Sequence, residues 1–275
     1  MTTKLIQKII LFSALFFVIA CKAQNFFEVT IPGFLSNEKV KLEYYEYIPE
    51  KWNGHVIVMN HGSTGGKPVS IKTSFRFVNI SKIANQNGFA FLAFNRKGRG
   101  KSEGIFTEET GKCDFGSLSR ESQEAVGQLR QVVSFAKEKF KVEKVVLMGH
   151  SRGGFLSSHY AGTFPADVLA VVNLAGAWSA VCEQRNGGFA KHHFESSAKI
   201  FKNQFWVYFD NDSYFSQAKF GEPNYDWFRS TAEKNNLEFF KFSDGGRAEG
   251  HETPTHLPKE WASEVFPKLI KSVSK

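Results

Sequence analysis

Short runs of consecutive apolar residues alternate with longer segments in which apolar residues recur every three or four positions. The runs predict buried β-strands over residues 56–59, 89–94, 144–148, 168–174, 204–209 and 237–242. The periodic segments predict helices over residues 68–86, 117–140, 152–163 and 258–270. Strands that are apolar on both faces and alternate with amphipathic helices are typical of a parallel sheet that helices cover on both sides. We therefore expect an α/β fold with a mostly parallel, doubly wound sheet.

A hairpin is predicted ahead of this alternating region. Residues 26–31 and 39–48 are rich in β-branched and aromatic side chains, and Pro32-Gly33 lies between them. Such a pair of segments indicates two antiparallel strands. No internal repeat and no Pro/Ser-rich linker interrupts the chain from there on, and 275 residues suit one large domain. We interpret residues 25–275 as a single domain.

The first twenty residues have the pattern of a targeting segment. Two lysines precede an almost purely apolar run, residues 9–20. That length is short for a membrane span, which needs about 20 residues, but typical of a signal peptide. The run ends in Val18-Ile19-Ala20-Cys21, which resembles the bacterial lipobox. We expect residues 1–20 to be removed and Cys21 to carry lipid, with the membrane contacted only through that anchor. Ordinary secretory cleavage a few residues later is the alternative, and a transmembrane anchor is least favoured.

Composition narrows the class of protein further. The formal net charge is +8, which raises the question of nucleic-acid binding. Removing residues 1–20, which hold two lysines and no acid, lowers it to +6. Most of the remaining basic residues are interspersed with acidic ones, and an exported protein does not meet nucleic acid, so we expect no such partner. The 29 phenylalanines predict a large aromatic core or an apolar pocket.

The strongest chemical signal is Gly149-His150-Ser151-Arg152-Gly153. A predicted strand precedes it and a predicted helix follows, which is the context of a nucleophile elbow. Glycines permit the sharp turn that lifts the serine hydroxyl above the sheet. The motif and its context resemble the α/β-hydrolase fold superfamily, and more narrowly its bacterial dienelactone-hydrolase-like branch. The resemblance spans roughly residues 40 to 270 and implies Ser151 as nucleophile.

The resemblance also implies an acid and a histidine, in that order after the serine. His251 follows Gly250 after the last predicted strand, as in the family's Gly-His pair, and His256 is the fallback. Asp210 and Asp212 both follow the strand over residues 204–209. The surrounding segment resembles a signature in which the second acid is catalytic, so we choose Asp212. Its expected role is to orient the imidazole of His251 and to stabilise the imidazolium.

Two backbone amides are expected to bind the oxyanion of the intermediate. One belongs to Arg152, the residue after the nucleophile, and the other comes from the loop after the first buried strand. His61-Gly62-Ser63 resembles the family's His-Gly oxyanion loop, and by position the amide of Ser63 is the donor. The loop over residues 96–104 resembles the family's Arg-Gly-x-Gly-x-Ser loop, which is largely structural. It lacks the glycines that a phosphate-binding or dinucleotide-binding motif requires.

These residues together predict an exported serine hydrolase acting on small-molecule carboxylic esters. Because the histidine and aspartate activate the serine, no metal or cofactor is expected. The best-known dienelactone hydrolases use a cysteine nucleophile, so the serine favours ordinary esters. The predicted cap between the strands at 168–174 and 204–209 is small, and Trp178, Tyr214 and Phe215 indicate either aromatic substrates or plain packing.

Three alternatives remain open from sequence. A small serine peptidase of the same fold is the first, and a non-catalytic binding lipoprotein on a hydrolase scaffold is the second. The third concerns Cys113 and Cys182. In an oxidising compartment outside the cytoplasm they could form a disulfide, or they could remain as two free thiols.

Overall fold

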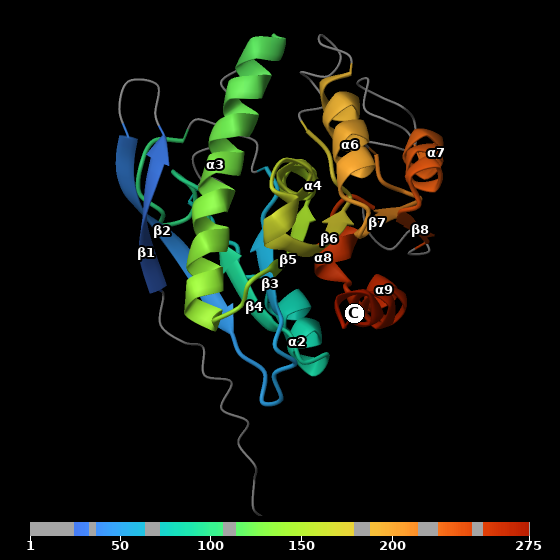
Figure 1. Cartoon of the computed structure of the whole chain (residues 1–275), viewed down its shortest axis with the longest axis horizontal. Coiled ribbons are helices and arrows are strands. Elements are labelled where there is room, and N and C mark those ends of the chain that lie inside the picture. Colours follow the sequence, from blue (N-terminus) through green and yellow to red (C-terminus); the bar gives the residue numbers. More distant parts are fainter. Residues whose placement is uncertain are drawn as a thin grey trace, which may run out of the picture.

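The chain forms one eight-stranded sheet flanked by helices (Figure 1). The computed structural model describes residues 25–32, 37–63, 72–106, 114–178, 188–213, 225–243 and 250–274. The strand order is β1-β2-β4-β3-β5-β6-β7-β8. The strands are β1 (Asn25–Pro32), β2 (Asn37–Tyr47), β3 (Val56–Asn60), β4 (Ala90–Phe94), β5 (Val145–His150), β6 (Val168–Leu174), β7 (Gln204–Phe209) and β8 (Glu238–Phe242).

The predicted mixture of strand directions is confirmed. β1 pairs with β2 in antiparallel register, Asn25 opposite Tyr44, and β2 is antiparallel to β4. Every pair from β4 through β3, β5, β6 and β7 to β8 is parallel. The parallel strands β3, β4, β5 and β7 are buried along their whole length, which explains their unbroken apolar runs.

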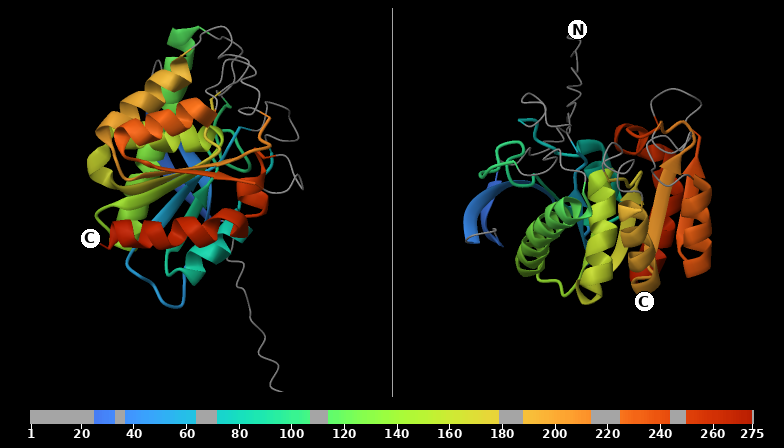
Figure 2. Two further views of the ribbon diagram at one scale, coloured as in Figure 1. Left: turned by 90° about the vertical axis from the view of Figure 1, so that its right-hand side faces the viewer. Right: turned by 90° about the horizontal axis from the view of Figure 1, so that it is seen from above.

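Helices cover both faces of the sheet, as Figure 2 shows from the side. The helices are α2 (Val78–Gln86), α3 (Phe115–Phe140), α4 (Arg152–Thr163), α6 (Phe189–Ile200), α7 (Tyr225–Asn235), α8 (Thr253–His256) and α9 (Lys259–Val273), with a 3-10 turn at Pro165–Asp167. One core layer packs under α3, α4, α6 and α7, and the opposite layer packs under α2 and α9. Several of the 29 phenylalanines lie in these layers, and Phe89, Phe91, Phe94 and Phe155 are fully buried. No helix of the described residues is long and apolar enough to cross a membrane.

One predicted helix is shorter in the structure than the periodicity suggested. The sequence predicts a helix over 68–86, whereas residues 72–77 are not helical and α2 begins at Val78. The ring of Phe75 stacks on His61 with centroids 4.5 Å apart, and its backbone N–H donates to Asn95 Oδ1 at 2.9 Å. These tertiary contacts hold the segment against the loop that follows β3, so local periodicity is overridden. Residues 64–71 lie outside the described part of the chain.

The region between β6 and β7 contains α6, which packs directly on α4. A Cβ at Gly162 of α4 would lie 2.8 Å from Ser197 Cα, so glycine permits this close approach. The small cap that we predicted falls partly on residues 179–187, which lie outside the described residues.

The order of the strands also places the loops that matter for function. β3 lies between β4, the next strand along the chain, and β5, which follows β4 in the chain but lies on the opposite side of β3. Loops that follow β3 and β5 therefore diverge at the carboxyl edge of the sheet, which is where ligands bind in open α/β sheets.

Candidate active site

Ser151 occupies the sharp turn between β5 and α4. Its backbone dihedrals are φ 53° and ψ −124°, a strained combination for a residue with a side chain. The backbone N–H of Ser151 donates to Leu174 O at 2.9 Å and holds the turn in place. The flanking glycines are required by space, since a Cβ at Gly149 would lie 2.1 Å from Gly153 O. A Cβ at Gly153 would lie 2.1 Å from Asn60 O.

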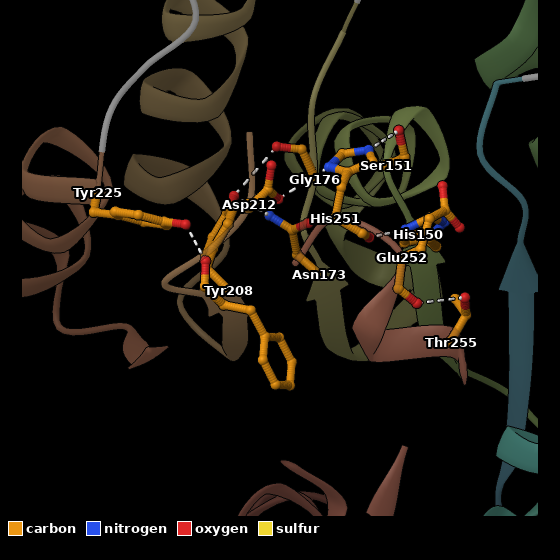
Figure 3. Close-up of polar contacts among 11 residues, drawn as sticks. His150, Ser151, Asn173, Gly176, Tyr208, Asp212, Tyr225, His251, Glu252 and Thr255 are labelled. Atoms are coloured by element: carbon orange, nitrogen blue, oxygen red, sulfur yellow. Dashed lines mark hydrogen bonds and ion pairs between the residues drawn. The ribbon is translucent and has the colours of Figure 1, made fainter. Parts of the chain in front are cut away.

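Three side chains from separate strand ends form a hydrogen-bonded chain, which Figure 3 shows with His251 in the middle. His251 Nε2 lies 2.8 Å from Ser151 Oγ, and His251 Nδ1 lies 3.0 Å from Asp212 Oδ2. Asp212 is fully buried and follows β7, and His251 is buried and precedes α8. The carboxylate accepts a hydrogen bond from Nδ1–H, which keeps the ring proton on Nδ1, so that Nε2 can take the proton of the serine hydroxyl. The arrangement can activate Ser151 as a nucleophile.

Asp210 and His256 take no part in the hydrogen bonds that join Ser151, His251 and Asp212. Asp210 is exposed, and its backbone N–H donates to Phe242 O at 2.9 Å. His256 is the last residue of α8, and its backbone N–H donates to Glu252 O. The structure thus places Asp212 and His251, rather than these two alternatives, beside each other.

Gly250 brings His251 to the aspartate. Its backbone N–H donates to Asn211 O at 3.3 Å, and a Cβ there would lie 2.3 Å from Asp212 N. No side chain fits at that distance. The Gly-His pair of the sequence therefore reflects close packing of the loop after β8 against the loop after β7.

His150 is a buried residue of the site to which the sequence pattern assigned no role. Its Nε2 lies 2.6 Å from the carbonyl oxygen of His251. Burial, together with the smaller effect of the neighbouring His251, lowers the pKa of His150 to about 4. A neutral imidazole whose Nε2 carries the proton donates to that carbonyl and holds the backbone of His251 in place. The sequence feature that could have identified His150 as part of the site is its position directly before Ser151.

Of the two residues expected to donate to the oxyanion, Arg152 follows Ser151 in the chain, and Ser63 follows Gly62, which lies close to Ser151 in space. The Arg152 amide follows Ser151 at the start of α4, where helix N–H groups have no partner within the helix. Gly62 lies against the nucleophile, because a Cβ there would be 3.1 Å from Ser151 Cβ. Ser63 follows it and is exposed. Backbone N–H groups of the loop beside Ser151 and of the helix that follows Ser151 can both donate to the oxyanion of a bound substrate.

Comparison with known proteins identifies the family to which this fold belongs. A family model described as the alpha/beta hydrolase fold matches residues 55–212, which is more than half of the chain. The chain belongs to the α/β-hydrolase fold family. The match contains β3 with its loop, the elbow at Ser151, and Asp212 at its last position.

Solved α/β-hydrolase structures share the fold at low sequence identity. Est1E from Butyrivibrio proteoclasticus, solved with ferulic acid bound, has 17% identity and a TM-score of 0.63, over 86% of this chain and 97% of that one. An esterase of Pyrococcus furiosus has 16% identity and a TM-score of 0.60, covering 90% and 92%. A structure from a study of carboxylesterases in the thaumarchaeon Nitrososphaera has 15% identity and a TM-score of 0.58, covering 90% and 99%. No curated protein matches the sequence.

The aromatic and cysteine residues singled out in the sequence either pack in the core or lie outside the described residues. Trp178 is buried in the core, with ring contacts to Phe155 and Phe189 and the Arg152 guanidinium 4.6 Å from its ring centroid. This favours packing over substrate contact. The described residues contain no group of three or more His, Cys, Asp or Glu side chains that could hold a metal ion. Residues Cys21, Cys113, Cys182, Tyr214 and Phe215 lie outside the described residues.

Proposed function

We propose that this protein is a serine hydrolase that cleaves carboxylic esters through an acyl-enzyme. The observation that carries the proposal is the unbroken hydrogen-bonded chain Ser151–His251–Asp212, with contacts of 2.8 Å and 3.0 Å. Such a chain is needed because a serine hydroxyl is a weak nucleophile until a base takes its proton.

In the proposed reaction Ser151 Oγ attacks the ester carbonyl carbon while His251 Nε2 takes the hydroxyl proton. Asp212 stabilises the resulting imidazolium, and the amides of Ser63 and Arg152 hold the negatively charged oxygen. The intermediate collapses, the alkoxy group leaves with the proton from His251, and the acyl group stays on Ser151. Water, deprotonated by His251, then attacks the acyl carbon. The second intermediate collapses, the bond to Ser151 Oγ breaks, and His251 returns the proton to that oxygen as the acid leaves. Side chains, backbone amides and the attacking water supply every proton and donor, so the scheme requires no cofactor.

Labelling by a fluorophosphonate probe tests whether the serine is activated. We expect wild-type protein to be labelled and the Ser151→Ala variant to be unlabelled and inactive. Ser134→Ala, on the exposed face of α3, is the control and should be labelled like wild type. Folded wild-type protein that takes no label would contradict the proposal and would favour a non-catalytic binding protein.

A substrate panel decides the class of bond. p-Nitrophenyl esters of increasing acyl length are compared with aminoacyl esters, aminoacyl anilides and dienelactone. Ferulic acid esters belong in the panel because Est1E was solved with ferulic acid bound. Faster turnover of anilides than of esters would favour the small serine peptidase instead. Membership of the dienelactone-hydrolase-like branch is part of the proposal, and Ser151 in place of cysteine favours esters over dienelactones.

We also propose that the protein is exported and anchored by lipid at Cys21. The support is the pattern of the first twenty-one residues, with basic, apolar and lipobox-like parts in order. An ester hydrolase held by a lipid anchor would act at a membrane surface while its catalytic domain remains in water.

A further inference from the structure

The side chain of Arg96, which follows β4, contacts the end of β3 and the loop after it. Arg96 is fully buried. Its Nη1 donates to Asn60 Oδ1 and to His61 O, both at 2.6 Å, and its Nη2 donates to Gly62 O at 3.2 Å. One side chain therefore contacts three consecutive residues, the last of β3 and the first two of the loop that follows it.

The Gly62 carbonyl oxygen receives a second donor. The Arg96 backbone N–H donates to His61 Nε2 at 3.1 Å, so the ring proton of His61 is on Nδ1. That Nδ1 lies 2.7 Å from Gly62 O and donates to it. The ring is held by stacking on Phe75 at 4.5 Å. Two N–H groups thus converge on one carbonyl oxygen.

The orientation of that carbonyl determines where the next amide points. The Gly62 C=O and the Ser63 N–H belong to one planar peptide group and point in opposite directions. Donors on the oxygen therefore hold the Ser63 N–H on the other side, and a reversed peptide would lose both contacts. Gly62 lies against Ser151, since a Cβ there would be 3.1 Å from Ser151 Cβ.

We propose that Arg96 is a positioning residue that orients the Gly62–Ser63 peptide so that the Ser63 amide binds the oxyanion. The proposal rests on the proposed function, in which Ser63 N–H is one of two donors. The guanidinium also polarises the peptide, because a donor at the carbonyl oxygen strengthens the N–H of the same peptide group.

Kinetics of Arg96→Met test the proposal, since methionine fills the space of the arginine stem without its donors. We expect kcat to fall by about 10²–10³-fold, the loss typical of one oxyanion donor, with KM little changed. Affinity for a phenylboronic acid, whose serine adduct carries the oxyanion, should fall by a similar factor. Arg96→Lys, which keeps a charge and a donor, should recover part of both losses.

A double-mutant cycle shows whether Arg96 acts through Ser63. Ser63→Pro removes the amide proton, and we expect Arg96→Met to cost little further activity in that background. Arg99→Met is the matched control, because Arg99 is equally buried in the same loop with its guanidinium 3.8 Å from the Phe106 ring centroid. That variant should lose stability while keeping the kcat of the folded fraction.

Several results would overturn the inference. The first is a wild-type kcat in Arg96→Met. The second is a loss of kcat on Arg96→Met that is as large in the Ser63→Pro background as in the wild type. The third is a loss of kcat in Arg99→Met equal to that in Arg96→Met. If Arg96→Met does not fold, the same cycle is run with Arg96→Lys, which must then show the kcat loss without a KM change. A wild-type protein that neither hydrolyses esters nor takes a fluorophosphonate label would overturn the proposed function as well, whereas the first three results leave that function intact.

Discussion

Asp210 and Asp212 lie two positions apart after β7 but have opposite surroundings. Asp212 is fully buried with its carboxylate 3.0 Å from His251 Nδ1, while Asp210 is exposed. A buried carboxylate beside an imidazole holds one tautomer and stabilises the positive charge that develops during the reaction. An exposed one at a strand end does neither.

Replacing each aspartate in turn should separate these roles. We expect Asp212→Asn to lower kcat by about 10⁴-fold, because an amide favours the wrong tautomer of His251. Asp210→Asn should have nearly wild-type kinetics on the best p-nitrophenyl ester. Loss of activity in Asp210→Asn with turnover preserved in Asp212→Asn would show that our choice of acid is wrong.

Gly250 offers a second test at the scale of one residue. A Cβ there would meet Asp212 N at 2.3 Å and Asn211 Oδ1 at 2.5 Å, so Gly250→Ala must displace the His251 loop. Displacement of a catalytic group by about 1 Å costs roughly 10²-fold in rate. We expect a loss of that size in kcat, with circular dichroism unchanged. Gly116→Ala is the control, since a Cβ there would meet its nearest neighbour, Asp114 Oδ1, at 3.3 Å. Equal activity in the two variants would contradict this interpretation.

At the scale of elements, α4 and α6 meet across a group of histidines. The rings of His159 and His193 lie with centroids 4.1 Å apart, and His192 lies beside His193. His159 Nδ1 also contacts Ser122 Oγ of α3 at 2.8 Å. Burial is the main cause and the neighbouring histidines the lesser cause of a pKa lowered to about 4 in His159 and to about 3 in His193.

These depressed pKa values make the packing of α6 sensitive to acid. An unfolded histidine takes up a proton near pH 6.5, whereas the folded forms resist protonation until lower pH. The stability contributed by the neutral rings is therefore full above about pH 6.5 and is lost as pH falls toward 4. We expect Tm to decrease over this range, and to decrease by several degrees less in His193→Phe. Parallel Tm-versus-pH curves for the two proteins would contradict this.

The elements themselves were predictable to different degrees. The strands and α3 follow from apolar runs and periodicity, and α3 starts where the Asp114 side chain accepts from Ser117 N–H. The start of α2 was wrong by about ten residues because Phe75 packs on His61. A contact between residues from different loops is invisible to local periodicity, and here it outweighs helix propensity.

At the scale of the whole molecule, the remaining prediction concerns where the protein is located. If Cys21 carries lipid, expression in a bacterial host should place the mature chain in the membrane fraction, with mass spectrometry finding an acylated N-terminal cysteine. Cys21→Ser should abolish the acylation and leave a soluble or unprocessed chain with the same specific activity. An unmodified mature chain beginning after Cys21 would favour ordinary secretion.

The sequence by itself determined the class of fold and identified Ser151 as the candidate nucleophile. Both depend on short-range patterns, since apolar runs mark buried strands and the glycines around Ser151 mark a turn that few other residues can make. The acid and the histidine could be narrowed to neighbouring pairs, by resemblance and by position after a strand.

The tertiary structure decided which residues meet. Asp212 rather than Asp210 faces His251, His150 supports the backbone of His251, and Arg96 contacts the loop beside the serine. Each of these contacts joins residues that lie far apart in the chain, 101 positions in the case of His150 and His251. Only the strand order of the sheet brings such residues within hydrogen-bonding distance. The contacts of His150 and Arg96 therefore could not be predicted from local patterns, whereas Asp212 and His251 were chosen by resemblance to a known family.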